Sequence, residues 1–290
     1  MGLFQREKKC YDGYLVKKLD PIVFMMPYIM PRKADSEVKV ELRIDLEKVE
    51  QFIREQKKEN MKDLTLFHIV FASIVRAATI TPEINRFIAG NRIYQRRHVR
   101  ISMVVKKELA ITGKETTIFP TFQTTDTLKD IVRKIKHETD EAFLDKKADS
   151  NNFDKLTRVL YLTPPFLLRT VVGFIRFLDR HGRLPKFLVD LQPFHSGFFV
   201  SNVGSIGLPV VYHHLYEFGT TTCFATIGKK EMVNVVNSNG EVVRKRYLPL
   251  KFVLDERICD GFTYSCAFRT IKRCFDNPEW LLESYNGSVV

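Results

Sequence analysis

The chain has 290 residues, of which 44% are hydrophobic and 12% aromatic, enough to form the core of one large domain or two small ones. This composition excludes a disordered protein. The 46 basic and 34 acidic residues give a net charge of +12, which favours phosphate-bearing ligands, anionic lipid surfaces or nucleic acid without selecting among them.

The first half of the chain alternates between strand and helix patterns. Residues 36–45 alternate apolar and polar side chains, which predicts a half-buried strand. Asp45 then caps a predicted helix whose apolar residues share one stripe, Leu46, Val49, Phe52 and Ile53. Residues 64–80 are apolar almost all round, which predicts a helix buried on most sides that ends before Pro82.

Two strands joined near residues 95–98 and an amphipathic helix over residues 127–143 follow. Residues 145–192 differ, because a polar break precedes two short apolar and basic helical segments. We interpret them as a helical insertion that packs on the body or covers a substrate, with membrane-surface contact as the less favoured alternative. The remaining patterns predict strands at 197–202, 222–228, 232–236 and 244–254, then helices near 264–275 and 278–285.

The five cysteines and the N-terminus bear on the compartment. An odd number of cysteines without Cys-x-x-Cys spacing predicts neither a disulfide framework nor a zinc site. The N-terminal residues lack the apolar core of a signal peptide, and prolines and arginines interrupt the longest apolar stretch, residues 159–178. We therefore expect a soluble, cytoplasmic protein with no metal site.

Two segments carry the most specific patterns. Residues 199–207 read Phe-Val-Ser-Asn-Val-Gly-Ser-Ile-Gly, and residues 254–262 read Leu-Asp-Glu-Arg-Ile-Cys-Asp-Gly-Phe. The second resembles the His-x-x-x-Asp-Gly motif of dihydrolipoamide acyltransferases and chloramphenicol acetyltransferases, with Glu256 in place of the histidine. The first is similar to the Thr-Ile-Ser-Asn-Leu-Gly segment of the same acyltransferases.

The resemblance extends over most of the chain except residues 145–192, with residues 27–45 resembling the family's first core strand. It implies a chloramphenicol acetyltransferase-like fold, an α/β (α+β) two-layer sandwich with a mixed sheet flanked by helices. It also implies a homotrimer with active sites between subunits. We therefore predict a single acyltransferase-like catalytic domain over residues 1–290, in a stand-alone form, with the helical insertion at about 145–192.

The resemblance also assigns roles to motif residues. Ser201 would donate a hydrogen bond to the oxyanion, Asp260 would pair with an arginine and hold the loop, and Gly261 would permit a tight turn. Asn202 and Arg257 are secondary candidates from the same motifs.

The base that removes the acceptor proton is the open question, because a glutamate in water is about two pKa units less basic than a histidine. Three hypotheses remain: Glu256 is the base, His213 or His214 replaces it, or the site no longer catalyses. Cys259 lies inside the motif, but we interpret it as a small buried residue because no histidine is its neighbour.

The functional prediction is a CoA-dependent acyltransferase that moves an acyl group from a thioester to a thiol or hydroxyl acceptor. Acyl-CoA, or a lipoyl thioester, would be a co-substrate, with no permanently bound cofactor. The alternative is a catalytically inactive homotrimeric scaffold or ligand-binding protein. A nucleic-acid partner is not expected, because the basic residues are scattered and match no nucleic-acid-binding motif.

Overall fold

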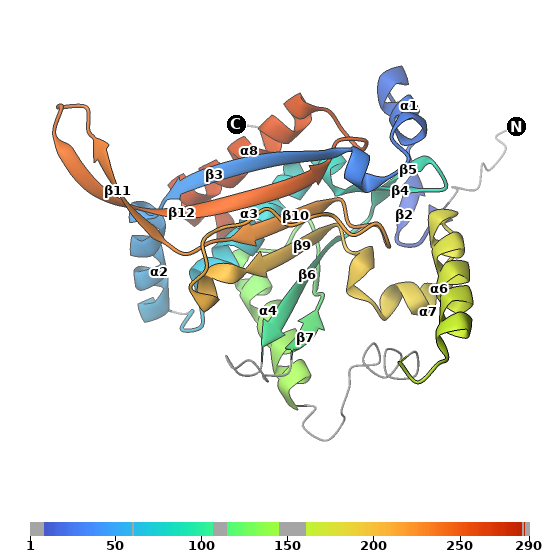
Figure 1. Cartoon of the computed structure of the whole chain (residues 1–290). Coiled ribbons are helices and arrows are strands. Elements are labelled where there is room, and N and C mark those ends of the chain that lie inside the picture. The colour runs from blue at the N-terminus through green and yellow to red at the C-terminus, as the bar shows by residue number, and fades with distance from the viewer. Residues whose placement is uncertain (1–8, 60, 107–114, 145–160, 286, 288–290) are drawn as a thin grey trace, which may run out of the picture.

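The computed structural model describes residues 9–59, 61–106, 115–144, 161–285 and 287 (Figure 1). Its helices are α1 (Pro21–Ile29), α2 (Glu47–Glu59), α3 (Leu66–Ile80), α4 (Leu128–Leu144), α6 (Pro165–Arg180), α7 (Lys186–Asp190) and α8 (Gly261–Asp276). Its strands are β1 (Lys9–Cys10), β2 (Gly13–Leu15), β3 (Glu37–Asp45), β4 (Arg86–Ala89), β5 (Arg92–Arg96), β6 (Val99–Lys106), β7 (Glu115–Ile118), β8 (Thr121–Phe122), β9 (Phe198–Asn202), β10 (Cys223–Ile227), β11 (Glu231–Val236) and β12 (Val242–Asp255).

The main sheet is mixed. Its strands follow the order β11-β12-β10-β9-β6-β7, with β3 also paired to β12 and β8 to β6. Strand β9 runs parallel to both β6 and β10, whereas β12 is antiparallel to β10, β11 and β3. A smaller sheet has the order β1-β2-β5-β4. The predicted fold class, a mixed sheet flanked by helices, is confirmed.

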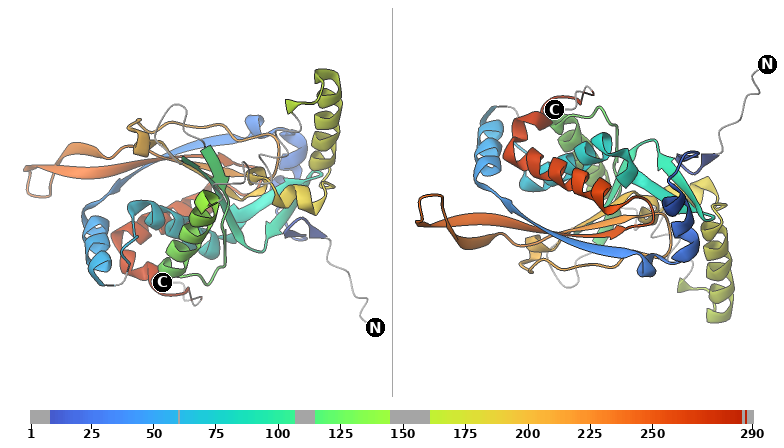
Figure 2. Two further views of the ribbon diagram at one scale, coloured as in Figure 1. Left: turned by 90° about the horizontal axis from the view of Figure 1, so that it is seen from below. Right: turned by 90° about the horizontal axis from the view of Figure 1, so that it is seen from above.

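Helices α2, α3, α4 and α8 cover one face of the main sheet (Figure 2). Helix α3 is buried on most sides, as its apolar sequence predicts, and contributes Phe71 and Ile74 to the core. The strands contribute alternate residues, among them Val200 of β9, Ala225 of β10 and Phe252 of β12. Burial of these apolar side chains stabilises the two-layer arrangement.

The opposite face of the sheet carries a smaller apolar cluster, formed by Phe199, Phe224 and Val253 together with Leu215 from the segment after β9. Because side chains alternate along a strand, Ser201 points to the same face as Phe199, away from the helices. One half of the candidate site therefore lies on the face that the helices leave uncovered.

The two ends of the sheet differ. The β11–β12 hairpin extends beyond the body at one end, and α1 and α6 lie at the other (Figure 1). Helix α6 is attached to the smaller sheet through a hydrogen bond from the Gly90 amide to the Arg180 carbonyl, 2.9 Å. Its only buried side chain is Asp179.

Two sequence predictions need correction, and a third falls partly outside the described residues. The segment at 27–45 is not all strand, because α1 continues to Ile29 and β3 begins at Glu37. At the C-terminus, residues 278–285 form only a short 3-10 helix, Pro278–Leu281, rather than an α-helix. The insertion was predicted at 145–192, and residues 145–160 lie outside the described part. Helices α6 and α7 occupy the rest of it.

Candidate active site

The first motif ends strand β9. Asn202 caps the following 3-10 turn, because its side-chain oxygen accepts from the Ser205 amide at 3.2 Å and its carbonyl accepts from the Ser205 hydroxyl at 2.7 Å. Gly207 closes the turn with φ +80°, a conformation that suits glycine. Ser201 is half-buried, and its hydroxyl makes no hydrogen bond to any described residue. The hydroxyl is therefore available to a ligand.

The second motif is a loop between β12 and α8, fixed by a buried ion pair. Arg257 donates to both carboxylate oxygens of Asp255, at 2.8 and 2.7 Å, and also to the Met30 carbonyl at 3.0 Å. Asp255 accepts a further hydrogen bond from the Ser36 hydroxyl at 3.0 Å. Both members of the pair are buried, so Arg257 acts in this chain as a support for the loop.

Glu256 sits at the tip of this loop. Its amide donates to the Ser36 carbonyl at 3.1 Å, which fixes the backbone, while its side chain is exposed. No described residue forms an ion pair or hydrogen bond with its carboxylate. Glu256 forms no ion pair with its neighbour Arg257, because Asp255 binds that arginine.

Two predicted roles at the end of the motif are also wrong. Asp260 does not pair with an arginine among the described residues. It caps α8 by accepting from the Thr263 amide at 2.7 Å, and this hydrogen bond lowers the pKa of its carboxyl. Gly261 has no left-handed backbone, and a Cβ at this position would meet open space. The chain therefore does not need a glycine there for the turn.

Ser201 and Glu256 lie at opposite ends of the sheet. Ser201 pairs with Thr226, and Thr226 pairs with Lys251 of β12. Glu256 lies five residues beyond Lys251, so the two side chains are separated by about 17 Å along the strands and about 10 Å across them. One reacting carbonyl cannot lie within hydrogen-bonding distance of both side chains of a single chain.

The two adjacent histidines lie over the uncovered face. His213 stacks on Phe224, with ring centroids 4.0 Å apart, and its Nδ1 lies 2.8 Å from the His214 carbonyl oxygen. Phe224 is two residues before Thr226, the strand partner of Ser201. His213 therefore shares a face with Ser201, about 7 Å along the strand direction, whereas His214 is more exposed.

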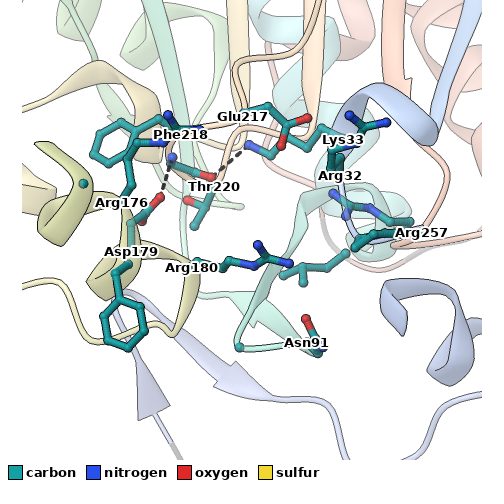
Figure 3. A pocket seen from close by; sticks show the side chains of 16 residues that line it. Arg32, Lys33, Asn91, Arg176, Asp179, Arg180, Glu217, Phe218, Thr220 and Arg257 are labelled. Carbon is teal, nitrogen blue, oxygen red and sulfur yellow. Dashed lines mark hydrogen bonds between the residues drawn. The ribbon is translucent and has the colours of Figure 1, made fainter. Parts of the chain in front are cut away.

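A pocket of about 400 Å³ lies beside the Arg257 loop, between α6 and the segments that follow α1 and β9 (Figure 3). Its charged lining residues are Arg32, Lys33, Arg176, Asp179, Arg180, Glu217 and Arg257. The sequence shows only a weak signal for it, the spacing of two arginines one helical turn apart in the insertion. Nothing in the sequence indicates that Lys33 is buried.

Other candidate chemistry is absent from the described ranges. Cys259 is 2% exposed, and burial raises the pKa of its thiol to about 12, which disfavours the thiolate. Within these ranges, no three histidine, cysteine or acidic side chains cluster as metal ligands do. None of the described helices combines the length and apolar character needed to cross a bilayer.

Comparison with known proteins matches the region that contains both motifs to a family. Residues 190–283, about a third of the chain, match the sequence model of the 2-oxoacid dehydrogenase acyltransferase catalytic domain. A probable dihydrolipoamide acetyltransferase from Listeria monocytogenes is 15% identical with a TM-score of 0.55, over 95% of this chain and 98% of that one. The chain has the fold of a dihydrolipoamide acyltransferase catalytic domain. The predicted resemblance to this family is thereby confirmed.

Other solved structures show the same fold. The cubic core of a pyruvate dehydrogenase multienzyme complex is 14% identical, with a TM-score of 0.52 over 92% of this chain and 94% of that one. A chloramphenicol acetyltransferase is 11% identical, with a TM-score of 0.51 over 90% and 98%. No curated protein matches the sequence significantly.

Proposed function

We propose that the protein is an acyltransferase that moves an acyl group from a CoA or lipoyl thioester to a thiol or hydroxyl acceptor. The observation that carries the proposal is the placement of both motifs on the acyltransferase fold, inside the matched region 190–283. One related structure, from Azotobacter vinelandii, is reported with the roles of a serine, a histidine and an asparagine in its catalytic mechanism. Ser201, Glu256 and Asp260 stand at the matching motif positions of this chain.

The proposed reaction uses one base and one oxyanion donor. The acceptor's sulfur or oxygen attacks the thioester carbonyl while Glu256 takes the acceptor proton, and Ser201 donates a hydrogen bond to the oxyanion. The tetrahedral intermediate then expels the CoA thiolate, which recovers a proton from the Glu256 carboxyl. One bond from the acyl carbon to the acceptor is formed, and the carbon–sulfur bond of the thioester is broken.

The proposed active site requires two copies of the chain. Ser201 and Glu256 of one chain are too far apart to act on one carbonyl, so Ser201 of one subunit would meet Glu256 of the next. Such a heterologous contact closes into a ring, and a homotrimer is the ring that the resemblance implies. The exposed Glu256 side chain, without a partner among the described residues, fits a group that completes its site across an interface.

A second candidate function is an inactive scaffold or ligand-binding protein. The observation that favours it is the replacement of the family histidine by Glu256, together with the lack of any described contact that orients this carboxylate. In this case the fold would bind acyl-CoA without turning it over.

Free CoA release from a panel of acyl-CoAs with thiol and hydroxyl acceptors tests these candidates. Glu256→Gln should lower kcat by about 10²- to 10⁴-fold and Ser201→Ala by about 10²- to 10³-fold. The matched controls, Glu279→Gln and Ser265→Ala, change exposed side chains on the C-terminal helices and should leave kcat unchanged.

The alternatives give different results in the same assay. Full activity in Glu256→Gln but not in the double variant His213→Ala/His214→Ala would reject Glu256 and assign the base to the histidine pair. Tight binding of acyl-CoA with no turnover of any acceptor would favour the scaffold.

A further inference from the structure

The pocket beside the Arg257 loop is lined by more basic than acidic side chains. Two of its five basic side chains are already paired, Arg257 with Asp255 and Arg32 with Asp35 at 2.7 Å. The other three are Lys33, Arg176 and Arg180, and none of them forms an ion pair with a described residue. Arg180 extends from α6 into the pocket, on the side that faces Arg257 (Figure 3).

The two acidic side chains of the pocket accept hydrogen bonds from backbone amides. Asp179 accepts from the Gly219 amide at 2.8 Å, and burial raises the pKa of its carboxyl. Glu217 accepts from the Ala34 amide at 3.0 Å. Both carboxyl groups therefore hold backbone segments of the wall.

Lys33 forms part of the wall as a buried ammonium group. Its Nζ donates to the carbonyl oxygens of Tyr216 and Gly219, at 2.7 and 2.8 Å. An ammonium group has three donors, so one remains for a ligand. Burial lowers the pKa of Lys33 to about 8, a cost that an anion in the pocket would offset.

Two arginines of α6 line the pocket at a spacing that suits an anion. Arg176 and Arg180 are one helical turn apart, so they lie on one face of α6, and like charges at this spacing repel each other. Planar guanidinium groups bind phosphate through paired hydrogen bonds. A volume of about 400 Å³ is in the range of sites for small organic ligands.

We propose that this pocket binds the phosphate group of a small-molecule ligand between Arg176 and Arg180 of α6 and Lys33. Both arginines lie outside residues 190–283, so the site depends on the insertion rather than on the matched region. The proposal does not depend on acyl transfer, because binding is measured without turnover. The phosphate belongs either to CoA or to a free phosphate compound, and the experiment separates these sources.

Calorimetric titration of the protein with inorganic pyrophosphate, at constant ionic strength, tests the site. Arg176→Gln and Arg180→Gln should each weaken binding about tenfold or more, consistent with loss of one charge-assisted contact. Arg169→Gln is the matched control, because this exposed arginine is on the same helix but does not line the pocket. Its affinity should equal that of the wild type.

Competition identifies the source of the phosphate. Displacement of pyrophosphate by CoA, but not by pantetheine, which lacks phosphate, would support the site and assign it to CoA. Binding of pyrophosphate that CoA does not displace would support the site for a free phosphate compound. Absence of pyrophosphate binding to the wild type, or an equal loss of affinity in Arg169→Gln, would overturn the proposal.

Discussion

Replacing Asp255 with asparagine should destabilise the protein by about 3 to 5 kcal/mol, because it leaves a buried guanidinium without its counter-ion. Asp255 is 0% and Arg257 4% exposed, and the carboxylate accepts two of the three guanidinium hydrogen bonds, at 2.8 and 2.7 Å. Asparagine keeps the shape but has one acceptor oxygen instead of two, so the change removes the charge and at least one hydrogen bond. An exposed pair contributes only about 0 to 1 kcal/mol, and Asp35→Asn, which breaks the exposed Arg32–Asp35 pair, is the matched control.

Urea unfolding followed by fluorescence measures both changes. Trp280 is the only tryptophan of the chain and packs against Arg76 and Arg273, with guanidinium-to-ring distances of 4.8 and 4.6 Å. Protein concentration must be held constant, because subunit association adds to apparent stability. A loss below 1 kcal/mol in Asp255→Asn, equal to that of Asp35→Asn, would refute the claim that this buried pair fixes the loop.

Three further predictions concern local stability. Burial lowers the pKa of His68 to about 4 from 6.5, so protonation of this histidine destabilises the folded state. The free energy of unfolding is therefore fully retained above pH 6.5 and decreases as the pH falls toward 4. The loss is at most about 3 kcal/mol, and His68→Gln should remove this part of the pH dependence of urea unfolding. Asp260→Ala should lower the free energy of unfolding by about 1 kcal/mol and Asp260→Asn by much less, because asparagine can also cap α8. Equal decreases in the urea midpoints of the two variants would contradict the capping role. Gly219→Ala should lower the melting temperature strongly, because Gly219 has φ +82° and a Cβ would lie 2.2 Å from the Phe194 carbonyl oxygen. An unchanged melting temperature would contradict this backbone geometry.

Much of the fold follows from local sequence patterns. Alternation along residues 36–45 identifies β3, and the apolar run at 64–80 identifies α3, because burial of one face or of most sides leaves a direct periodic signal. Helix α1 has a weak sequence signal, because Pro27 lies inside it. Its start has a visible cap, since Asp20 accepts from the Ile22 amide at 2.9 Å and Pro21 is the first helical residue.

The candidate site was predictable only in part. The motif positions of Ser201 and Glu256 follow from short strings of sequence, but the distance between them depends on strand register, which no local pattern contains. Asp260 was expected to pair with an arginine but caps α8, whereas the buried Asp255 at the end of β12 binds Arg257. Burial of Lys33 depends on carbonyl groups of residues 216 and 219, which are distant in sequence.

Mixed oligomers test most directly the central claim, that Ser201 of one chain and Glu256 of another complete one active site. Purified Ser201→Ala and Glu256→Gln proteins, each nearly inactive alone, would be dissociated, mixed in equal amounts and reassociated. If the site is shared between subunits, about a quarter of the sites would combine an intact serine with an intact glutamate, and CoA release should recover to about that fraction of the wild-type rate. Activity that stays at the level of the separate variants after verified subunit exchange would contradict the shared site.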